Sequence, residues 1–192
     1  MTASQDTLRT DARRARASMN TAERDRASRI ITERVSSAHW FQRAEYVACY
    51  LPAQHEVNTW EIISRAWQQK KRVFAPVCEK NFRMRFVEIT PETEVRRNSF
   101  GIYEPDEGDE VTARMLDLVI TPLVAFDENR HRVGMGGGYY DRAFSFLRHR
   151  STWLHPKLVG VAFACQQVHQ IPPNPWDIPL FAVITENSVH SR

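Results

Sequence analysis

Glycine is scarce in this sequence. Only seven of the 192 residues are glycine, where average usage would give roughly thirteen. Four of the seven lie in one short window, from Gly134 to Gly138. A chain that avoids glycine elsewhere and concentrates it in one place needs a special backbone geometry there. The window is therefore a candidate ligand-binding loop.

Long apolar runs are missing as well. The longest uninterrupted run, from Leu158 to Cys165, has eight residues, whereas a membrane span needs about twenty. This excludes a transmembrane helix. The first residues lack the apolar segment of a secretory signal, and their acidic side chains argue against a transit peptide. We expect a cytoplasmic protein with no membrane partner.

Cysteine is rare, and its spacing is uninformative. Cys49, Cys78 and Cys165 are odd in number and form no Cys-x-x-Cys pair, which indicates reduced thiols. No histidine–cysteine cluster has the spacing of a zinc site. A Ser-His-Asp signature and a nucleophile elbow are also missing. The sequence thus points neither to a structural zinc site nor to a hydrolase with a side-chain nucleophile.

The chain has no large excess of either charge. Lys and Arg number 26 and Asp and Glu 23, a net charge of +3, which is too small to indicate nucleic-acid binding. Arg9, Arg13 and Arg16 nevertheless share one face of a predicted helix. This stripe is either a solvated helix face or an anion-binding surface. An RNA-binding module that uses it is an alternative from another functional class, although we expect no nucleic-acid partner.

The order of apolar runs predicts an α/β fold in a single domain, residues 1–192. A capping-box pattern at Asn20 and Glu23 divides the first forty residues into two helices. Apolar, strand-like runs then alternate with helical segments, which indicates a mostly parallel sheet with helices on both faces. Strands are expected at 46–51, 72–77, 84–89, 116–126, 158–164 and 181–185, and helices at 58–69 and from about 140. Ligands of such folds bind beyond the carboxyl ends of the strands, and Pro52, Pro76 and Pro122 mark ends or interruptions of strands.

The glycine window lies between two arginines, Arg132 and Arg142, and is followed by Asp141. Successive glycines let several backbone N–H groups converge on one anion, and the N-terminus of a following helix adds a favourable dipole. The two arginines can contact phosphate oxygens, and Asp141 can hold a Mg²⁺ ion that accompanies a nucleotide. The spacing matches neither a P-loop nor a dinucleotide fingerprint. On its own the segment therefore indicates an anion site, with a tight, flexible turn as the alternative.

Two further segments carry candidate side chains. Glu56, shortly after the first predicted strand, can accept hydrogen bonds from ring N–H groups of a ligand, although a glutamate in a loop is often merely solvated. Asp177 follows a proline-rich loop, where an aspartate usually forms a turn.

Taken in this order, the segments resemble the 5-formyltetrahydrofolate cyclo-ligase family from about Leu8 to Glu186. The most specific match is the Pro-Leu-Val-Ala-Phe-Asp run that ends at Asp127, followed by the glycine loop and its Tyr-Tyr-Asp end. The resemblance implies a ligase that uses ATP and Mg²⁺ to convert 5-formyltetrahydrofolate to 5,10-methenyltetrahydrofolate. In that reaction the formyl oxygen attacks the γ-phosphate of ATP, N10 attacks the resulting N5-iminium phosphate, and phosphate leaves. Such chemistry depends on positioning and charge neutralisation, which agrees with the missing nucleophile.

The resemblance also implies roles for individual residues. ATP would contact Gln5, Arg9, Arg132, Gly134, Met135, Gly136, Gly137, Gly138, Tyr139 and Tyr140. The folate substrate would contact Leu51, Glu56, Phe100, Met135 and Tyr139. Catalysis would rest on Arg132, Tyr139 and Asp141, and Mg²⁺ would be held by Asp141 and Asp177.

The chain departs from the family pattern in two ways. Gln5 stands where many members have a lysine, and Met135 and Gly137 stand where some members have basic residues. Phosphate charge would then rest on backbone N–H groups, Arg132 and Arg142. We expect a monomer that binds only these small molecules. A related ATP-dependent enzyme that acts on a different acceptor is the alternative within the same fold.

Overall fold

The computed structural model describes residues 4–98, 101–149 and 155–191. Its main sheet comprises β1 (Tyr46–Cys49), β2 (Arg72–Cys78), β3 (Met84–Ile89), β6 (Glu110–Val111), β7 (Leu118–Pro122), β10 (Lys157–Val161), β11 (Ala182–Ile184) and β12 (Val189–Ser191). Two hairpins are formed by β4 (Val95–Arg97) with β5 (Tyr103–Pro105), and by β8 (Ala125–Phe126) with β9 (Arg132–Val133). The α-helices are α1 (Gln5–Ser18), α2 (Thr21–Ser37), α3 (His39–Arg43), α4 (Trp60–Gln68) and α5 (Tyr139–Ala143). Short 3₁₀ helices are η1 (Lys80–Phe82), η2 (Ser145–His149) and η3 (Ala164–Gln166).

The strand order of the main sheet is β12-β11-β10-β7-β1-β2-β3-β6. The five strands from β11 to β2 are parallel, and β12, β3 and β6 add antiparallel edges. The predicted mostly parallel α/β sheet is confirmed. The predicted strand at 116–126 divides into β7 and β8 just after Pro122. Pro76 does not interrupt β2, because β1 pairs with β2 only as far as Phe74 and the missing N–H lies beyond that ladder.

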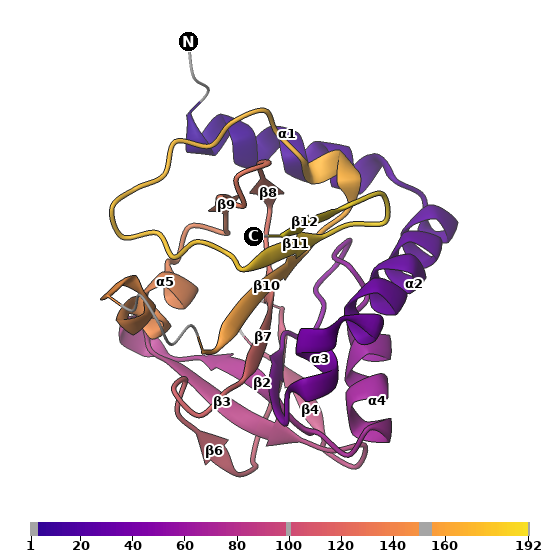
Figure 1. Cartoon of the computed structure of the whole chain (residues 1–192), viewed down its shortest axis with the longest axis vertical. Helices are drawn as coiled ribbons and strands as arrows, with labels where there is room; N and C mark the ends of the chain where they lie inside the picture. Colours follow the sequence, from indigo (N-terminus) through magenta and orange to yellow (C-terminus); the bar gives the residue numbers. More distant parts are fainter. Residues whose placement is uncertain (1–3, 99–100, 150–154, 192) are drawn as a thin grey trace.

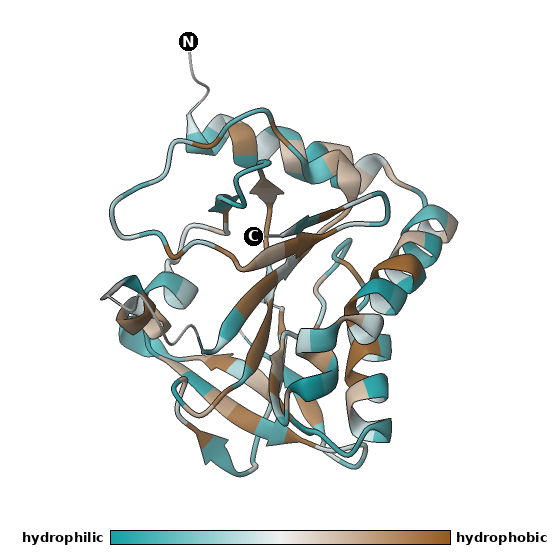
Figure 2. Ribbon diagram, viewed as in Figure 1, coloured by the Kyte–Doolittle hydropathy of each residue, from teal (hydrophilic) through white to brown (hydrophobic). Residues whose placement is uncertain are grey.

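Both faces of the sheet are buried, and the near-continuous apolar strands supply both cores. On one face, Val47 and Cys49 pack with Ile31 of α2 and Ile62 of α4. On the other face, Ala48 lies in a core with aromatic side chains from α5 and its surroundings. In Figure 2 the central strands are largely brown, and the helices beside them carry both teal and brown residues.

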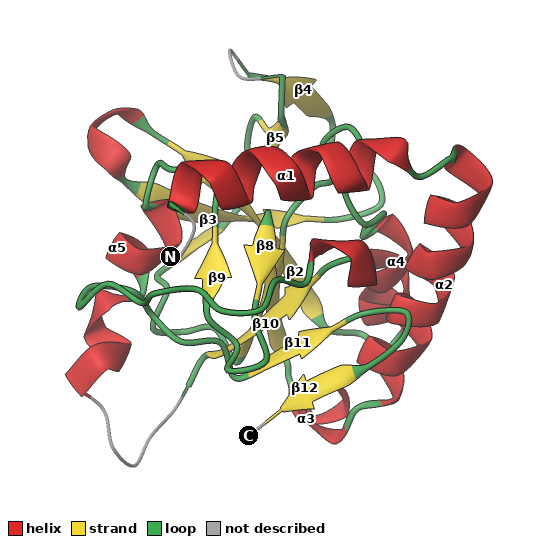
Figure 3. Ribbon diagram, turned by 90° about the horizontal axis from the view of Figure 1, so that it is seen from above, coloured by secondary structure: helices red, strands yellow, loops and turns green. Residues whose placement is uncertain are grey.

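The N-terminal helices form the predicted pair. The Asn20 side chain accepts a hydrogen bond from the Glu23 N–H, and the Glu23 carboxylate accepts one from the Asn20 N–H, so the capping box is confirmed. Helix α1 crosses the β8–β9 hairpin and η3, which follow β7 and β10 along the chain. It therefore lies at the carboxyl ends of the parallel strands, as Figures 1 and 3 show. Within the described ranges, no helix has the length and apolar character needed to cross a bilayer.

Candidate active site

The glycine loop, residues 134–138, connects β9 to α5. Gly136 and Gly138 have φ angles of 101° and 62°, which side chains other than hydrogen rarely tolerate. A Cβ on Gly137 would approach the Tyr139 ring to 2.8 Å. Gly134 differs from all three, because its φ lies outside the left-handed region and a Cβ there would meet no heavy atom of the described residues within 4 Å. The fold therefore explains three of these glycines but leaves the fourth unexplained.

The basic stripe on α1 contacts this loop. Arg9 donates from Nε to the Gly134 carbonyl oxygen at 2.9 Å, and it also bonds the Gln5 side chain and the Asp6 carboxylate. Arg13 contacts the Met135 sulfur at 3.1 Å. The stripe is therefore not a merely solvated helix face.

A closed set of hydrogen bonds holds the far end of the loop. Arg132 donates to the Asp141 carboxylate at 2.6 Å and to the Ile178 carbonyl oxygen. The Ile178 N–H in turn donates to the same carboxylate oxygen of Asp141, Oδ1, at 3.0 Å. The Arg132 side chain is only 7% exposed, so this pair ties the glycine loop to the 172–178 segment. That segment passes close to α5 in Figure 1.

Helix α5 is shorter than the sequence suggested. It has five residues, and its N-cap is Gly138, which provides no side-chain cap. A macrodipole needs several aligned peptides, so the expected dipole contribution at this end of the loop is small. The positive charges beside the loop are those of Arg9 and Arg132, which pair with Asp6 and Asp141.

Glu56 lies in a nearly buried position beside the carboxyl end of β1. Its side chain is 11% exposed and lies 3.6 Å from Nη1 of Arg16, whose side chain is 10% exposed. The Ala53 N–H donates to Oε2 of Glu56 at 3.0 Å. Burial raises the pKa of the Tyr140 hydroxyl well above its usual range, and nearby groups that include Glu56 raise it further.

Other residues beside β1 are more deeply buried. Leu51 is 3% exposed and packs in the apolar core, which leaves little of its side chain for a ligand. Burial raises the pKa of the Cys49 thiol to about 12 and that of the Cys78 thiol to about 11. Cys49, Cys78 and Cys165 are all free, as expected.

An aromatic residue missed in the sequence adjoins the loop. Phe82 is 50% exposed, and its ring centroid lies 5.8 Å from that of Tyr139. The Arg142 guanidinium lies over the Phe82 ring at 4.3 Å, and the Tyr139 hydroxyl donates to the Glu79 carbonyl oxygen at 3.3 Å. The sequence offered one signal for Phe82, which is a phenylalanine in a polar turn. An apolar ring that is exposed to water can indicate a binding surface, because it contributes no packing to the core.

The second predicted magnesium ligand has a local role in the structure. Asp177 accepts hydrogen bonds at Oδ2 from the backbone and side chain of Asn174, as a turn-forming aspartate does. Its neighbour Ile178 bonds Asp141, so both predicted carboxylates belong to one locality. Among the described residues, no three His, Cys, Asp or Glu side chains gather as a ready-made metal site. Phe100 lies outside the described residues.

The Phe-Asp turn before the loop is held by one buried carboxylate. Asp127 is fully buried and accepts hydrogen bonds from the His131 N–H, the His131 ring and the Ile171 N–H at 2.9–3.0 Å. We expect Asp127→Ala to lower the free energy of unfolding by about 2–4 kcal/mol, because buried donors lose their acceptor. Urea unfolding measures this, with the exposed neighbour Glu128→Ala as a control expected within about 0.5 kcal/mol of wild type. A midpoint for Asp127→Ala equal to that of Glu128→Ala would contradict the assignment.

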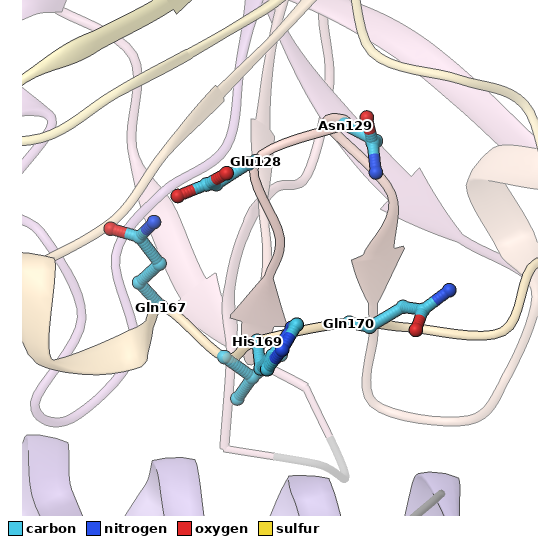
Figure 4. A pocket seen from close by; sticks show the side chains of 6 residues that line it. Glu128, Asn129, Gln167, His169 and Gln170 are labelled. Atoms are coloured by element: carbon cyan, nitrogen blue, oxygen red, sulfur yellow. The ribbon is translucent and has the colours of Figure 1, made fainter.

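A surface depression of about 580 Å³ lies at the closed end of the β8–β9 hairpin. Figure 4 shows Glu128 and Asn129 on the hairpin turn and Gln167, His169 and Gln170 on the neighbouring segment. The glycine loop leaves the hairpin at its opposite, open end. The depression is therefore separate from the site described above.

The chain is similar to a known family over most of its length. The model of the 5-formyltetrahydrofolate cyclo-ligase family matches residues 1–186. The 5-formyltetrahydrofolate cyclo-ligase of Haemophilus influenzae is 34% identical over 182 residues, covering 92% of this chain and 95% of the relative. The protein of the same name from Escherichia coli K12 is 40% identical over 150 residues, covering 76% and 80%.

Solved structures show the same fold. The NMR structure of Aquifex aeolicus 5,10-methenyltetrahydrofolate synthetase superposes with a TM-score of 0.83 at 28% identity, covering 97% of this chain and 92% of the other. A 5,10-methenyltetrahydrofolate synthetase from Mycoplasma pneumoniae shares the fold at 22% identity, with a TM-score of 0.76 and coverage of 96% and 99%. The chain therefore belongs to the 5-formyltetrahydrofolate cyclo-ligase family, a family of ligases, as its glycine loop and Tyr-Tyr-Asp segment predicted.

Proposed function

We propose that this chain converts 5-formyltetrahydrofolate to 5,10-methenyltetrahydrofolate with consumption of ATP and release of ADP and phosphate. Family membership supports the reaction. The observation that carries the site is the glycine loop, which is bonded at Gly134 to Arg9 and anchored by the Arg132–Asp141 pair. A Cβ on Gly134 or Gly136 would meet no heavy atom of the described residues within 4 Å. Backbone at these positions is accessible to an anion.

The ATP phosphates fit this loop because two kinds of donor converge on it. Backbone N–H groups of residues 134–138 provide neutral donors, and Arg9 and Arg132 provide charge. Arg132 uses only part of its guanidinium on Asp141 and Ile178, and a guanidinium has further N–H donors. Gln5 lies beside Arg9 and is polar but uncharged, whereas Asp6 in the same helix turn pairs with Arg9. Tyr139 and Tyr140 complete the wall of the proposed ATP site.

We assign the accompanying Mg²⁺ ion to Asp141 and Asp177. Magnesium is usually held by one or two carboxylates together with substrate phosphates, so a ready-made cage is not needed. Hydrogen bonds from described residues reach only Oδ1 of Asp141 and only Oδ2 of Asp177, which leaves the other oxygen of each carboxylate. When bound, the ion would neutralise negative charge on the phosphates.

The folate substrate is assigned to the neighbouring side of the site. Glu56 would accept hydrogen bonds from N–H groups of the pterin, and Tyr139 and Met135 would border the reacting centre. Leu51 contributes a buried apolar floor, and Phe100 is retained as a proposed ring contact.

The proposed mechanism has two bond exchanges. The formyl oxygen forms a bond to the γ-phosphorus while the bond to ADP breaks, giving an N5-iminium phosphate. N10 then bonds to the formyl carbon and loses its proton, and the carbon–oxygen bond breaks to release phosphate. Neither exchange needs a side-chain nucleophile, so the residues act by positioning and by stabilising charge. Arg132, Tyr139 and Asp141 are the proposed catalytic residues.

We also propose that the chain acts as a cytoplasmic monomer on these small molecules, without a nucleic-acid or membrane partner. Its three free cysteines suit a reducing compartment. The arginines of α1 that suggested an RNA surface are directed in part to the glycine loop, which supports the small-molecule assignment.

The test is a spectrophotometric assay for the methenyl product. Purified protein is mixed with 5-formyltetrahydrofolate in four reactions, with and without ATP and with and without Mg²⁺. We expect the methenyl absorbance to appear only when ATP is present and to depend on Mg²⁺. No ATP-dependent product would refute the proposal, and ADP formation with a different formylated acceptor would favour the related enzyme. Product formed equally well in excess chelator would remove the magnesium assignment alone.

A further inference from the structure

We propose that Arg16 is a positioning residue for Glu56, and that it tunes the affinity for the folate substrate without contacting it. This inference rests on the proposed function, because it takes Glu56 as the group that accepts substrate N–H groups. Arg16 belongs to the last turn of α1, whereas Glu56 lies in the loop after β1. The two side chains are 10% and 11% exposed, so they form a nearly buried ion pair.

A carboxylate in such a position needs compensation. Removing a charge from water costs several kcal/mol unless an opposite charge and hydrogen bonds replace the solvent. The Ala53 N–H provides one hydrogen bond to Oε2 of Glu56, and the guanidinium of Arg16 provides the charge. The Tyr50 and Tyr140 hydroxyls near Glu56 have pKa values raised by burial first and by Glu56 in addition. They therefore remain neutral at physiological pH and do not compete for the charge of Arg16.

The distance between the two groups is the informative detail. Nη1 of Arg16 lies 3.6 Å from Oε1 of Glu56, which is close enough for charge attraction but beyond the 2.7–3.2 Å of an N–H···O hydrogen bond. No described residue donates a hydrogen bond to Oε1, whereas Oε2 has the Ala53 N–H. Arg16 thus stabilises the carboxylate while Oε1 accepts no hydrogen bond from the described residues and can accept one from a ligand.

This arrangement suits a substrate with neutral N–H donors on a flat ring edge, such as the aminopyrimidinone part of a pterin. Hydrogen bonds to an ionised acceptor are about twice as strong as those between neutral groups. A bidentate arginine would occupy both oxygens, and no arginine would leave the buried carboxylate unpaired. The 3.6 Å separation of Arg16 and Glu56 avoids both an occupied and an unpaired carboxylate. It predicts that Arg16 affects folate binding rather than ATP binding or the chemical steps.

The test compares Arg16→Met and Arg16→Lys with a matched control, Arg34→Met. Arg34 also ties an N-terminal helix to the sheet, by a 3.1 Å hydrogen bond to the Thr185 carbonyl oxygen, but it lies outside the proposed site. We expect Arg16→Met to raise the KM for 5-formyltetrahydrofolate by about tenfold or more, with kcat and the KM for ATP changed less than about threefold. Arg16→Lys should recover most of this loss because it keeps the charge, and Arg34→Met should leave all three constants unchanged. Arg16→Gln, with the same expected loss, replaces Arg16→Met if that variant is recovered unfolded.

A double-mutant cycle with Glu56→Gln separates positioning from a general structural role. If Arg16 acts through the carboxylate, adding Arg16→Met to Glu56→Gln should raise the folate KM by less than about threefold further. The inference is overturned if Arg16→Met matches the control, if its effect persists at full size in the Glu56→Gln background, or if ATP binding suffers equally. A wild-type protein without ATP-dependent cyclisation would instead refute the proposed function.

Discussion

Asp141→Asn is expected to lower kcat/KM for ATP by at least about a hundredfold. The Asp141 carboxylate accepts hydrogen bonds from Arg132 at 2.6 Å and from the Ile178 N–H at 3.0 Å. An asparagine keeps an oxygen for these donors but loses the charge that pairs with Arg132 and that a magnesium ion requires. Groups that stabilise charge in a transition state contribute about 10²–10³ each. Steady-state kinetics over a matrix of ATP and Mg²⁺ concentrations measure the loss.

The loss of activity has to be distinguished from a loss of fold. The Arg132–Asp141 pair is 7% and 23% exposed, so its disruption also lowers the free energy of unfolding, by about 1–3 kcal/mol. Glu88→Gln is the matched control, because Glu88 pairs with Arg72 on the sheet and this contact lowers the pKa of Glu88. We expect Glu88→Gln to be less stable yet to keep wild-type activity per folded molecule. If Asp141→Asn keeps as much activity per folded molecule as this control, the Arg132–Asp141 pair is purely structural.

Local features of the fold were predictable because they are encoded over short distances. The capping box at Asn20 and Glu23 needs only a four-residue pattern, and it is present. The central strands were predictable because strands buried on both faces are apolar at every position. The division between β7 and β8 falls at Pro122, which the sequence marked as an end or interruption of a strand, although the apolar run continues through the buried Leu123 and Val124.

The site was predictable as a set of residues but not as a set of contacts. The spacing of Arg9, Arg13 and Arg16 predicted that they share one helix face. It could not predict which part of the protein that face contacts. In the structure Arg9 and Arg13 contact the glycine loop, more than 120 residues away in sequence, whereas Arg16 pairs with Glu56. Such pairings arise because α1 crosses the ends of the strands. A local sequence pattern carries no information about this long-range contact.

Two other residues show the limits of motif reading. The proline-rich context of Asp177 is typical of both a turn and a ligand loop, and the structure contains the turn. Phe82 belongs to no motif, and its contact with Arg142 and Tyr139 depends on the β2–β3 connection lying beside the glycine loop. Aromatic residues in polar turns are therefore worth testing as site candidates even where no motif includes them.

Gly134→Ala is expected to raise the KM for ATP by about tenfold or more while leaving the fold intact. A Cβ at this position meets no described heavy atom within 4 Å, and the φ angle lies outside the left-handed region. Alanine also lowers the entropy of the unfolded chain, so the free energy of unfolding should change by less than about 1 kcal/mol. The added methyl group would instead occupy the space in which a phosphate approaches the backbone, and small displacements of a reacting group are costly. Urea unfolding and kinetics at varied ATP concentration measure the two effects on the same protein.

Gly136→Ala provides the contrast. Gly136 has a φ of 101°, so alanine there should cost about 1 kcal/mol or more of stability and lower activity through a distorted loop. Gly134→Ala therefore separates ligand binding from folding, whereas Gly136→Ala affects both. If Gly134→Ala leaves both the KM for ATP and the stability unchanged, no phosphate approaches Gly134. If Gly134→Ala instead raises the KM for ATP and leaves the free energy of unfolding unchanged, this glycine is required by the nucleotide rather than by the fold.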